Sequence, residues 1–315
     1  MVSNHSIRST KNGGMASSAL TARSLPGLNA QTIRALFKGT RIPLTQVAKK
    51  AGVAPGVVLS VIQRQASLPA PGEPTTHILK PAIPSYPGTT ANEAFVMRLA
   101  AEMGLPVAKV EARRLFAERG LQTFLLVERY DRDHQHGRVV RLHQEDFCQA
   151  LGLTSAYKYE NHLGPGLARC RRLLLDHSEK PGADARDFID AVMFNLIVGN
   201  GDAHAKNFSF LFTPKGIRLA PLYDLLSTVY YPGLSMGMAM SIDGRFRFAD
   251  MDRQALESGA KAIGLNRTFL TKRLDLLRDK LPGAANRAAA GLLGQGLDDA
   301  VLERLVCERA DRLRP

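Results

Sequence analysis

The sequence contains no tryptophan, only three cysteines and no uninterrupted run of eighteen apolar residues. A helix needs about twenty apolar residues to cross a bilayer, so the sequence predicts neither a transmembrane segment nor a membrane partner. Cys148, Cys170 and Cys307 are too far apart for a Cys-x-x-Cys motif, which argues against a zinc site and a disulfide framework. We therefore expect reduced thiols and, since no apolar leader is apparent at the start, a cytoplasmic protein.

Acidic residues are scarce in the first quarter of the chain. Residues 1–75 contain nine Lys or Arg residues and one acid, Glu73, which gives this segment a charge of +8 out of +13 for the whole chain. Each basic side chain near a phosphate releases a counterion, so this basic end favours a polyanion such as DNA as a partner. A solubilising tail without any partner explains the same charge.

Proline, glycine and charge divide the chain into four parts. Residues 1–25 are polar and predict a flexible tail, in which Met15 is a second candidate for the first residue of the protein. Residues 26–66 are expected to be helical. Residues 67–132 are expected to form a small nucleotide-binding lobe with a hinge, and residues 133–315 a mainly helical lobe.

Apolar patterns within these parts predict individual elements. Strands are expected at "THILK" and "GLQTFLLVERYDR". The segment "NEAFVMRLAAEMGLP" has the spacing of a helix that ends at Gly104, and "FIDAVMFNLIVG" predicts a buried helix. A small mixed lobe followed by a larger helical lobe is the order found in phosphoryl-transfer enzymes of the protein-kinase type.

The densest cluster of reactive side chains follows that buried helix. The segment "GNGDAHAKNFS" contains Asp202, His204, Lys206 and Asn207, and Asp224 follows in "LAPLYDLLS". Phosphoryl transfer needs a carboxylate that orients the attacking hydroxyl, oxygen ligands for metal ions and a cation on the phosphates. Asp-x4-Asn followed by a second Asp matches the kinase spacing. Polar residues that merely cap a helix or turn are the alternative.

Two charged residues upstream complete the kinase order. Lys80 lies in the strand-like "THILKP", where kinases carry a phosphate-binding lysine. Glu93 stands near the start of the following helix, where it can pair with that lysine. The alternatives are an exposed strand lysine and an acid favoured only by the helix dipole.

Six segments resemble, in chain order, the HipA-type serine/threonine kinases of bacterial type II toxin–antitoxin systems: "THILKP", "VERYDR", "RLHQEDFCQALGL", "KYENHLGPG", "GNGDAHAKNFS" and "LAPLYDLLS". The resemblance covers residues 70–290 and implies an α+β, two-lobed kinase-like fold that uses ATP and Mg²⁺. It also implies a protein substrate in translation, such as an aminoacyl-tRNA synthetase, with growth arrest and persistence as the result. A small DNA-binding antitoxin is the implied partner.

The same resemblance assigns roles to the residues that match the family. Asp202 would be the catalytic base, and His204 and Lys206 would lie beside the transferred phosphoryl group. Asn207 and Asp224 would be the Mg²⁺ ligands.

For the nucleotide, the resemblance points to the small lobe. Lys80 would hold the ATP phosphates, with Glu93 as its partner. Glu128, Arg129 and Tyr130 would form the hinge, whose backbone groups would contact the adenine.

The family's phosphate-covering loop is not recognisable here. The matching window "PLTQVAKK" retains only Lys50 of the family pattern and lacks the glycine that lets a backbone cradle phosphate. Residues 43–63, "PLTQVAKKAGVAPGVVLSVIQ", resemble instead the helix-turn-helix of lac-repressor-type regulators. Lys49, Lys50, Ser60 and Arg64 would then contact DNA. A divergent phosphate loop or an amphipathic scaffold helix is the alternative.

Two hypotheses follow. The chain is an ATP- and Mg²⁺-dependent serine/threonine protein kinase of HipA type. Alternatively, it is a catalytically impaired HipA-like protein that acts as a DNA-binding regulator or a partner-binding module.

Overall fold

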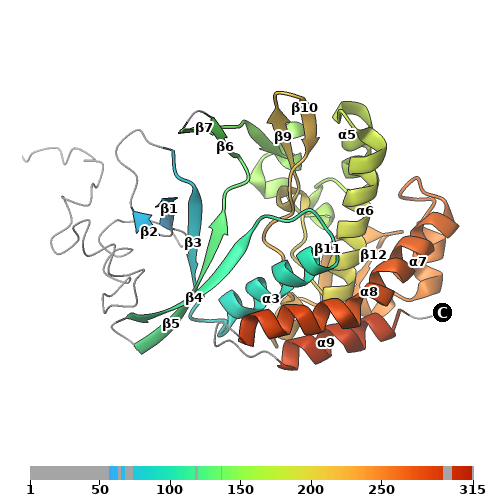
Figure 1. Cartoon of the computed structure of the whole chain (residues 1–315). Coiled ribbons are helices and arrows are strands. Elements are labelled where there is room, and N and C mark those ends of the chain that lie inside the picture. Colours follow the sequence, from blue (N-terminus) through green and yellow to red (C-terminus); the bar gives the residue numbers. More distant parts are fainter. Residues whose placement is uncertain are drawn as a thin grey trace, which may run out of the picture.

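The computed structural model describes part of the chain, namely residues 57–62, 65–67, 74–117, 120–135, 137–293 and 300–313 (Figure 1). The tail expected over residues 1–25 lies outside these ranges, as do Lys49, Lys50 and Arg64. The described residues form an α+β molecule with a sheet at one end and a group of helices at the other.

A five-stranded antiparallel sheet forms the first end (Figure 1). Its strands are β1 (Val57–Ile62), β2 (Gln65–Ser67), β3 (His77–Pro81), β4 (Val110–Ala117) and β5 (Gly120–Glu128). They lie in the order β2-β1-β3-β5-β4, and the predictions of β3 and β5 are confirmed. Lys80 of β3 pairs with Leu125 of β5, which is fully buried. Opposed residues of antiparallel strands share a face, so Lys80 projects from the side of the sheet that faces the core.

The helix expected in the second half of residues 43–63 is wrong. Residues Val57–Ile62 form β1, which pairs with β3 so that Val58 lies opposite Ile78. Valine and isoleucine lose side-chain freedom in a helix and fit the pleated surface of a strand, which explains the difference. Ser60, expected on a DNA-recognition helix, therefore lies in a strand, and the sheet begins before the small lobe was expected to start.

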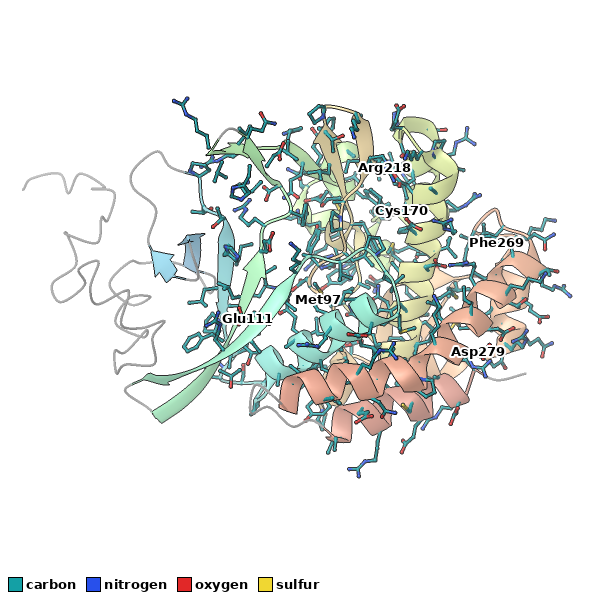
Figure 2. All side chains as sticks on the ribbon, viewed as in Figure 1. Met97, Glu111, Cys170, Arg218, Phe269 and Asp279 are labelled. Carbon is teal, nitrogen blue, oxygen red and sulfur yellow. The ribbon has the colours of Figure 1, made fainter. Side chains whose placement is uncertain are left out.

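Helix α3 (Thr89–Glu102) connects the sheet to the helices. It contacts β4 and β5 on one side and the long helix α8 (Arg267–Leu293) on the other (Figure 1). Met97 of α3 is buried, whereas Phe269 and Asp279 of α8 are exposed (Figure 2). The predicted helix is confirmed, and its charged residue Glu93 is held in the core.

Helices dominate the remainder of the chain. Besides α8 they are α4 (Phe147–Ala150), α5 (Leu167–His177), α6 (Pro181–Val198), α7 (Arg253–Gly259) and α9 (Ala300–Asp311). The predicted buried helix is α6, which contacts α5, α8 and α9 and contributes Phe188, Phe194 and Ile197 to the core. In the part of the chain that the structure describes, no helix combines the length and apolar character needed to cross a bilayer.

Short strands and turns lie between these helices. The strands are β6 (Arg132–Gln135), β7 (Arg138–Arg141), β8 (Gln144–Asp146), β9 (Ser209–Thr213), β10 (Gly216–Leu219), β11 (Gly237–Ile242) and β12 (Arg245–Arg247). Strands β6 and β7 form a hairpin, β10-β9-β8 a small sheet, and β11 and β12 a second hairpin. Short 3-10 turns occur at Ser155–Tyr157, Glu160–His162, Ala205–Asn207, Thr228–Tyr230 and Phe248–Asp250.

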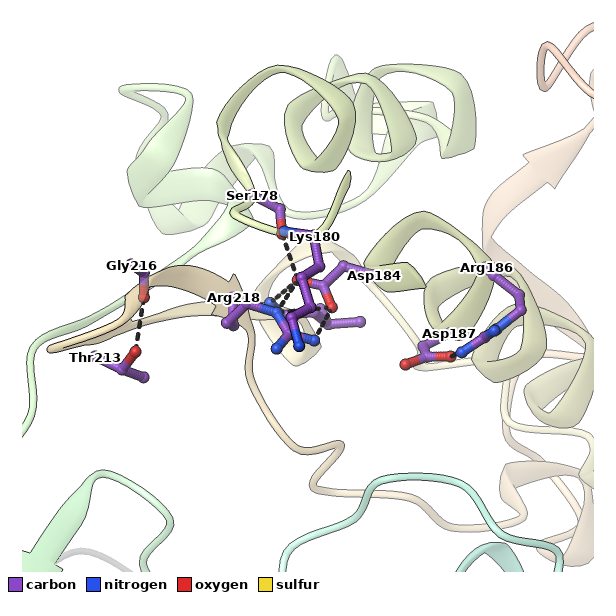
Figure 3. A network of polar contacts seen from close by, with 9 residues as sticks. Ser178, Lys180, Asp184, Arg186, Asp187, Thr213, Gly216 and Arg218 are labelled. Atoms are coloured by element: carbon purple, nitrogen blue, oxygen red, sulfur yellow. Dashed lines mark hydrogen bonds and ion pairs between the residues drawn. The ribbon is translucent and has the colours of Figure 1, made fainter. Parts of the chain in front are cut away.

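A buried carboxylate ties the first turn of α6 to β10 (Figure 3). Asp184 accepts hydrogen bonds from Arg218 Nη2 at 2.7 Å, from the Ser178 hydroxyl at 2.5 Å and from the Leu219 amide at 2.8 Å. Burial alone would raise the pKa of Asp184, but these donors outweigh it and lower the pKa. Because α6 leads into residues 199–207 and β10 pairs with the strand that follows them, Asp184 stabilises both supports of that loop.

A second polar contact joins α3 to the segment after β10. The Asn92 side chain is fully buried, donates to the Ser227 carbonyl at 2.9 Å and accepts from the Ser227 amide at 2.8 Å. One amide side chain thereby satisfies both backbone groups of a residue 135 positions away. This contact fixes the segment that carries Asp224 against α3.

We expect Asn92→Ala to lower the free energy of unfolding by about 2–6 kcal/mol, because it leaves two buried backbone groups of Ser227 without partners at about 1–3 kcal/mol each. Urea denaturation of the full chain measures this loss. Asn286→Ala, at an exposed position of α8, is the matched control and should change stability by less than about 0.5 kcal/mol. Equal stabilities of the two variants would contradict the proposed role of Asn92.

Candidate active site

Three charged residues that the sequence placed far apart meet between the sheet and the helices. Lys80 Nζ on β3 lies 2.6 Å from Glu93 Oε1 on α3 and 2.7 Å from Asp224 Oδ1, which follows β10. Both contacts are charge-assisted hydrogen bonds, which are stronger than those between neutral groups. The pairing of Lys80 with Glu93 is confirmed, and their role toward a nucleotide stays a prediction.

One ammonium shared by two carboxylates sets the electrostatics of this site. Burial raises the pKa of Glu93 to about 7, although Lys80 opposes the shift. Burial would lower the pKa of Lys80, but the ion pairs with the two carboxylates outweigh it and raise that pKa. Burial would raise the pKa of Asp224, as it does for Glu93, but the ammonium of Lys80 outweighs burial and lowers that pKa. The site therefore favours an additional cation.

Asp224 has an unusual backbone. Its φ is 58°, in the left-handed region that costs a non-glycine residue about 1–3 kcal/mol. This conformation directs Asp224 Oδ1 to Lys80 and Oδ2 to Asn207 Nδ2, at 3.1 Å. Backbone strain of this kind is typical of residues whose side-chain direction is functional.

The loop between α6 and β9 carries the cluster that the sequence singled out. Helix α6 ends at Gly199, where φ is 71° and a Cβ atom would lie only 2.4 Å from Val229 Cγ2, so only glycine fits. The Gly201 amide donates to Thr228 Oγ1 at 2.8 Å. Further along, the His204 amide donates to Asn207 Oδ1 at 3.1 Å. Together with the 3-10 turn at Ala205–Asn207, these bonds hold the loop in one conformation.

Asp202, the predicted base, lies on this loop with 47% of its side chain exposed. The Tyr159 hydroxyl donates to Asp202 Oδ1 at 2.6 Å. His204 Nε2 lies 3.9 Å from the same oxygen, which is too far for a hydrogen bond. Burial lowers the pKa of His204, so its imidazole is neutral at neutral pH and forms no ion pair with Asp202.

Lys206 is held by a carboxylate outside the loop. Its Nζ donates to Asp146 Oδ2 at 2.6 Å, and Asp146 is also the N-cap of α4. The Tyr223 hydroxyl donates to the Lys206 carbonyl at 2.6 Å. A second cation of fixed position thus lies on the same loop as Asp202, as charge compensation of a phosphoryl group requires.

Asn207 and Asp224 fit the donor set for Mg²⁺. They are in contact, and their side chains offer an amide oxygen and a carboxylate. Mg²⁺ usually keeps several waters and binds one or two carboxylates together with substrate phosphates. Asn207 Oδ1 accepts one bond, from the His204 amide, and a carbonyl oxygen has a second lone pair for a metal ion.

The three predicted hinge residues lie where β5 ends. The Glu128 amide donates to the Lys109 carbonyl at 2.8 Å, and the Arg129 amide donates to the Thr76 carbonyl at 2.9 Å. Both amides are therefore engaged within the protein. Adenine contacts at this position would use backbone carbonyls or the Tyr130 amide.

Sequence reasoning missed three side chains that touch the site. Tyr159, Asp146 and Thr228 contact Asp202, Lys206 and Gly201, respectively, as described above. Tyr159 and Asp146 lie inside two segments that carried the family resemblance, "KYENHLGPG" and "RLHQEDFCQALGL", which was the available signal. Their partners are 43 and 60 residues away, so no local pattern identified their function.

Comparison with known sequences places these contacts in a family. The model of the HipA-like C-terminal domain matches residues 48–284. A putative kinase, Y4mE, of Sinorhizobium fredii is 43% identical over 293 residues, which cover 93% of this chain and 67% of that protein. The serine/threonine-protein kinase toxin HipA of Shewanella oneidensis is 33% identical over 254 residues, covering 74% of this chain and 55% of the toxin.

Solved structures show the same fold. The Shewanella oneidensis complex of HipA, HipB and operator DNA contains a chain that matches with a TM-score of 0.75 and 30% identity, over 82% of this chain and 63% of that one. The proinflammatory kinase CtkA of Helicobacter pylori matches with a TM-score of 0.52 and 14% identity, over 82% and 88%, which shows a common fold alone. The chain thus spans between about half and two thirds of its HipA relatives' length.

The raised pKa of Glu93 predicts how stability depends on pH. With a pKa of about 7 in the folded protein against an ordinary value of 4.5, Glu93 binds more protons in the folded than in the unfolded state between these values. Stability from this group is therefore complete below pH 4.5 and is lost as the pH rises through 7. The Tm should therefore fall as the pH rises through 7, and we expect Glu93→Gln to reduce that fall.

Thermal unfolding of both proteins at closely spaced pH values tests the prediction. Glu179→Gln removes one exposed carboxylate with the same change of charge and is the matched control. If Tm changed with pH by the same amount in wild type and Glu93→Gln, the ion pair with Lys80 would cancel the effect of burial on the pKa of Glu93.

Proposed function

Since this chain belongs to the HipA-like C-terminal domain family, whose curated relatives include a serine/threonine kinase, we propose that it is an ATP- and Mg²⁺-dependent protein kinase. The observation that carries the proposal is the convergence of Lys80, Glu93 and Asp224 beside a loop that contains Asp202 and Asn207. The reaction would transfer the γ-phosphoryl group of ATP to a Ser or Thr hydroxyl of a protein.

The side chains of the loop divide the chemistry between them. Asp202 would accept the proton of the attacking hydroxyl, and its exposure leaves it accessible to an acceptor. Tyr159 holds one oxygen of that carboxylate, which directs the other toward the hydroxyl. His204 is neutral and buried, and its Nε2 lies 3.9 Å from Asp202 Oδ1, so it shapes the loop without an ion pair to the base.

The phosphates would lie between Lys80 and the loop. Asn207 and Asp224 would hold Mg²⁺, which supplies positive charge against the phosphate oxygens. Lys80 would bind the phosphates while Glu93 keeps its ammonium in place. Lys206 would add a second cation beside the transferred phosphoryl group.

The partners follow from the relatives. A solved structure contains HipA with HipB and operator DNA, so we propose a small DNA-binding antitoxin for this chain, with DNA contacted through it or directly. The substrate would be a translation protein such as an aminoacyl-tRNA synthetase, and its phosphorylation in the cytoplasm would arrest growth.

A catalytically impaired relative is the second candidate. The sequence window "PLTQVAKK", which lacks the family's glycine, motivates it, and the charge of +8 over residues 1–75 favours a DNA-binding role in that case. An activity assay separates the two candidates directly.

The kinase proposal predicts that purified protein transfers label from γ-labelled ATP and Mg²⁺ to a protein of a cytoplasmic extract. Loss of the base should slow transfer by about 10²- to 10⁴-fold in Asp202→Asn, with the free energy of unfolding unchanged. Asp176→Asn, at an exposed position of α5, is the control and should keep wild-type activity. Transfer that survives Asp202→Asn would remove Asp202 from its role, and a folded wild type without any transfer would favour the impaired relative.

Tyr159 is expected to act as a positioning residue. In Tyr159→Phe the carboxylate of Asp202 loses a hydrogen bond of the strong, charge-assisted kind, worth about 1.5–3 kcal/mol, so kcat should fall about tenfold or more. The KM for ATP should stay the same, because Tyr159 does not contact Lys80 or Asp224. Steady-state kinetics measure this split, with the exposed Tyr157→Phe as the control. An unchanged kcat would assign Tyr159 a purely structural role.

A further inference from the structure

A pocket of about 610 Å³ opens directly beside Asp202. This volume lies within the range of about 300–1,000 Å³ that is usual for binding sites. Its walls come from the segment after β3, from Tyr159 to His162, from the loop at Gly201 and Asp202, and from residues 226–246. Asp202 is thus part of the pocket wall, so whatever occupies the pocket lies next to the proposed base.

The walls of this pocket are mainly apolar. Ile83, Tyr86, Leu234, Met238 and Phe246 line it, and each of them is at least partly exposed. Among the described residues that line it there is no Lys or Arg, so an acidic side chain would meet the carboxylate of Asp202 without a compensating ammonium or guanidinium group. The lining therefore suits an apolar side chain.

Exposed apolar side chains continue from the pocket onto the surface. Ile83 is 46% exposed, Met236 is 54% exposed between two lining residues, and Leu163, next to the lining residue His162, is 80% exposed. Leu163 also has a φ of 66°, which is uncommon for a residue with a Cβ atom. Exposed apolar residues around the rim of a pocket are typical of a surface that contacts another protein.

We propose that this pocket binds a large apolar side chain of the acceptor protein, close in sequence to the Ser or Thr that receives the phosphoryl group. Because Asp202 itself lines the pocket and an extended chain advances about 3.3 Å per residue, the apolar residue lies within about three positions of the acceptor. The occupant is an extended segment of the substrate protein. This proposal deepens the proposed kinase function and rests on it for the identity of the acceptor.

Peptide binding tests the pocket without relying on catalysis. Fluorescein-labelled peptides carry one central Ser in an Ala-rich background, and Leu, Asp or Gly replaces each of the three positions on either side in turn. Anisotropy is measured with the full-length protein, Mg²⁺ and a non-hydrolysable ATP analogue. At one or two positions, Leu should tighten binding at least about tenfold relative to Asp or Gly.

Two variants make the test specific. In Ile83→Asp, which changes an exposed wall residue, the advantage of Leu should fall below about twofold, while binding of the ATP analogue is retained. Val140→Asp introduces the same change at an exposed position of β7 that does not line the pocket, and it should keep the full preference. An equal loss in both variants would overturn the proposal.

Phosphate transfer to the same peptides separates the two levels of inference. A Leu preference in binding without any transfer would support the pocket and count against the kinase function. Transfer with equal binding of the Leu, Asp and Gly peptides would leave the kinase function standing and overturn the pocket. Absence of peptide binding up to millimolar concentration would overturn the pocket as well.

Discussion

The ion pairs of Lys80 are the interaction on which the site depends. They join a strand, a helix and a loop segment that are separated by up to 144 residues, and they bring two carboxylates together that would otherwise repel each other. The contact of Asn92 with Ser227 runs beside them and connects the same helix to the same segment. Loss of these contacts would therefore remove a charge from the site. It would also detach the segment that carries Asp224 from the sheet and from α3.

The loop that carries Asp202 is positioned by contacts from outside it. Asp184 ties the start of α6 to β10, while Thr228 and the left-handed turn at Gly199 determine how the chain leaves α6. Asp202 is exposed and Asp224 has a strained backbone. Such a strained conformation persists because the well-packed structure around it holds it in place. The TM-score of 0.75 to the HipA chain shows that the overall fold is shared with a relative of 30% identity.

Several elements were predictable, and the reasons differ. Apolar residues of α3 have helical spacing, α6 contains a long apolar stretch, and β3 and β5 are bounded by proline, glycine and charge, so local patterns were sufficient. Strand β1 was expected to be a helix, because Gly52 as a turn residue and the spacing of the Val and Ile residues resemble a helix-turn-helix motif. Its pairing with β3 is a non-local interaction that no single stretch displays.

By itself, the sequence determined which residues make up the candidate site: the order of Lys80, Glu93, Asp202, Asn207 and Asp224 predicted phosphoryl transfer, because that reaction needs few groups at known spacings. Only the tertiary structure decided which oxygen meets which donor. It placed Tyr159 on Asp202 and Asp146 on Lys206, and it assembled an apolar pocket from four separate segments. Such contacts depend on how distant elements pack, and packing is a property of the whole chain rather than of any local pattern.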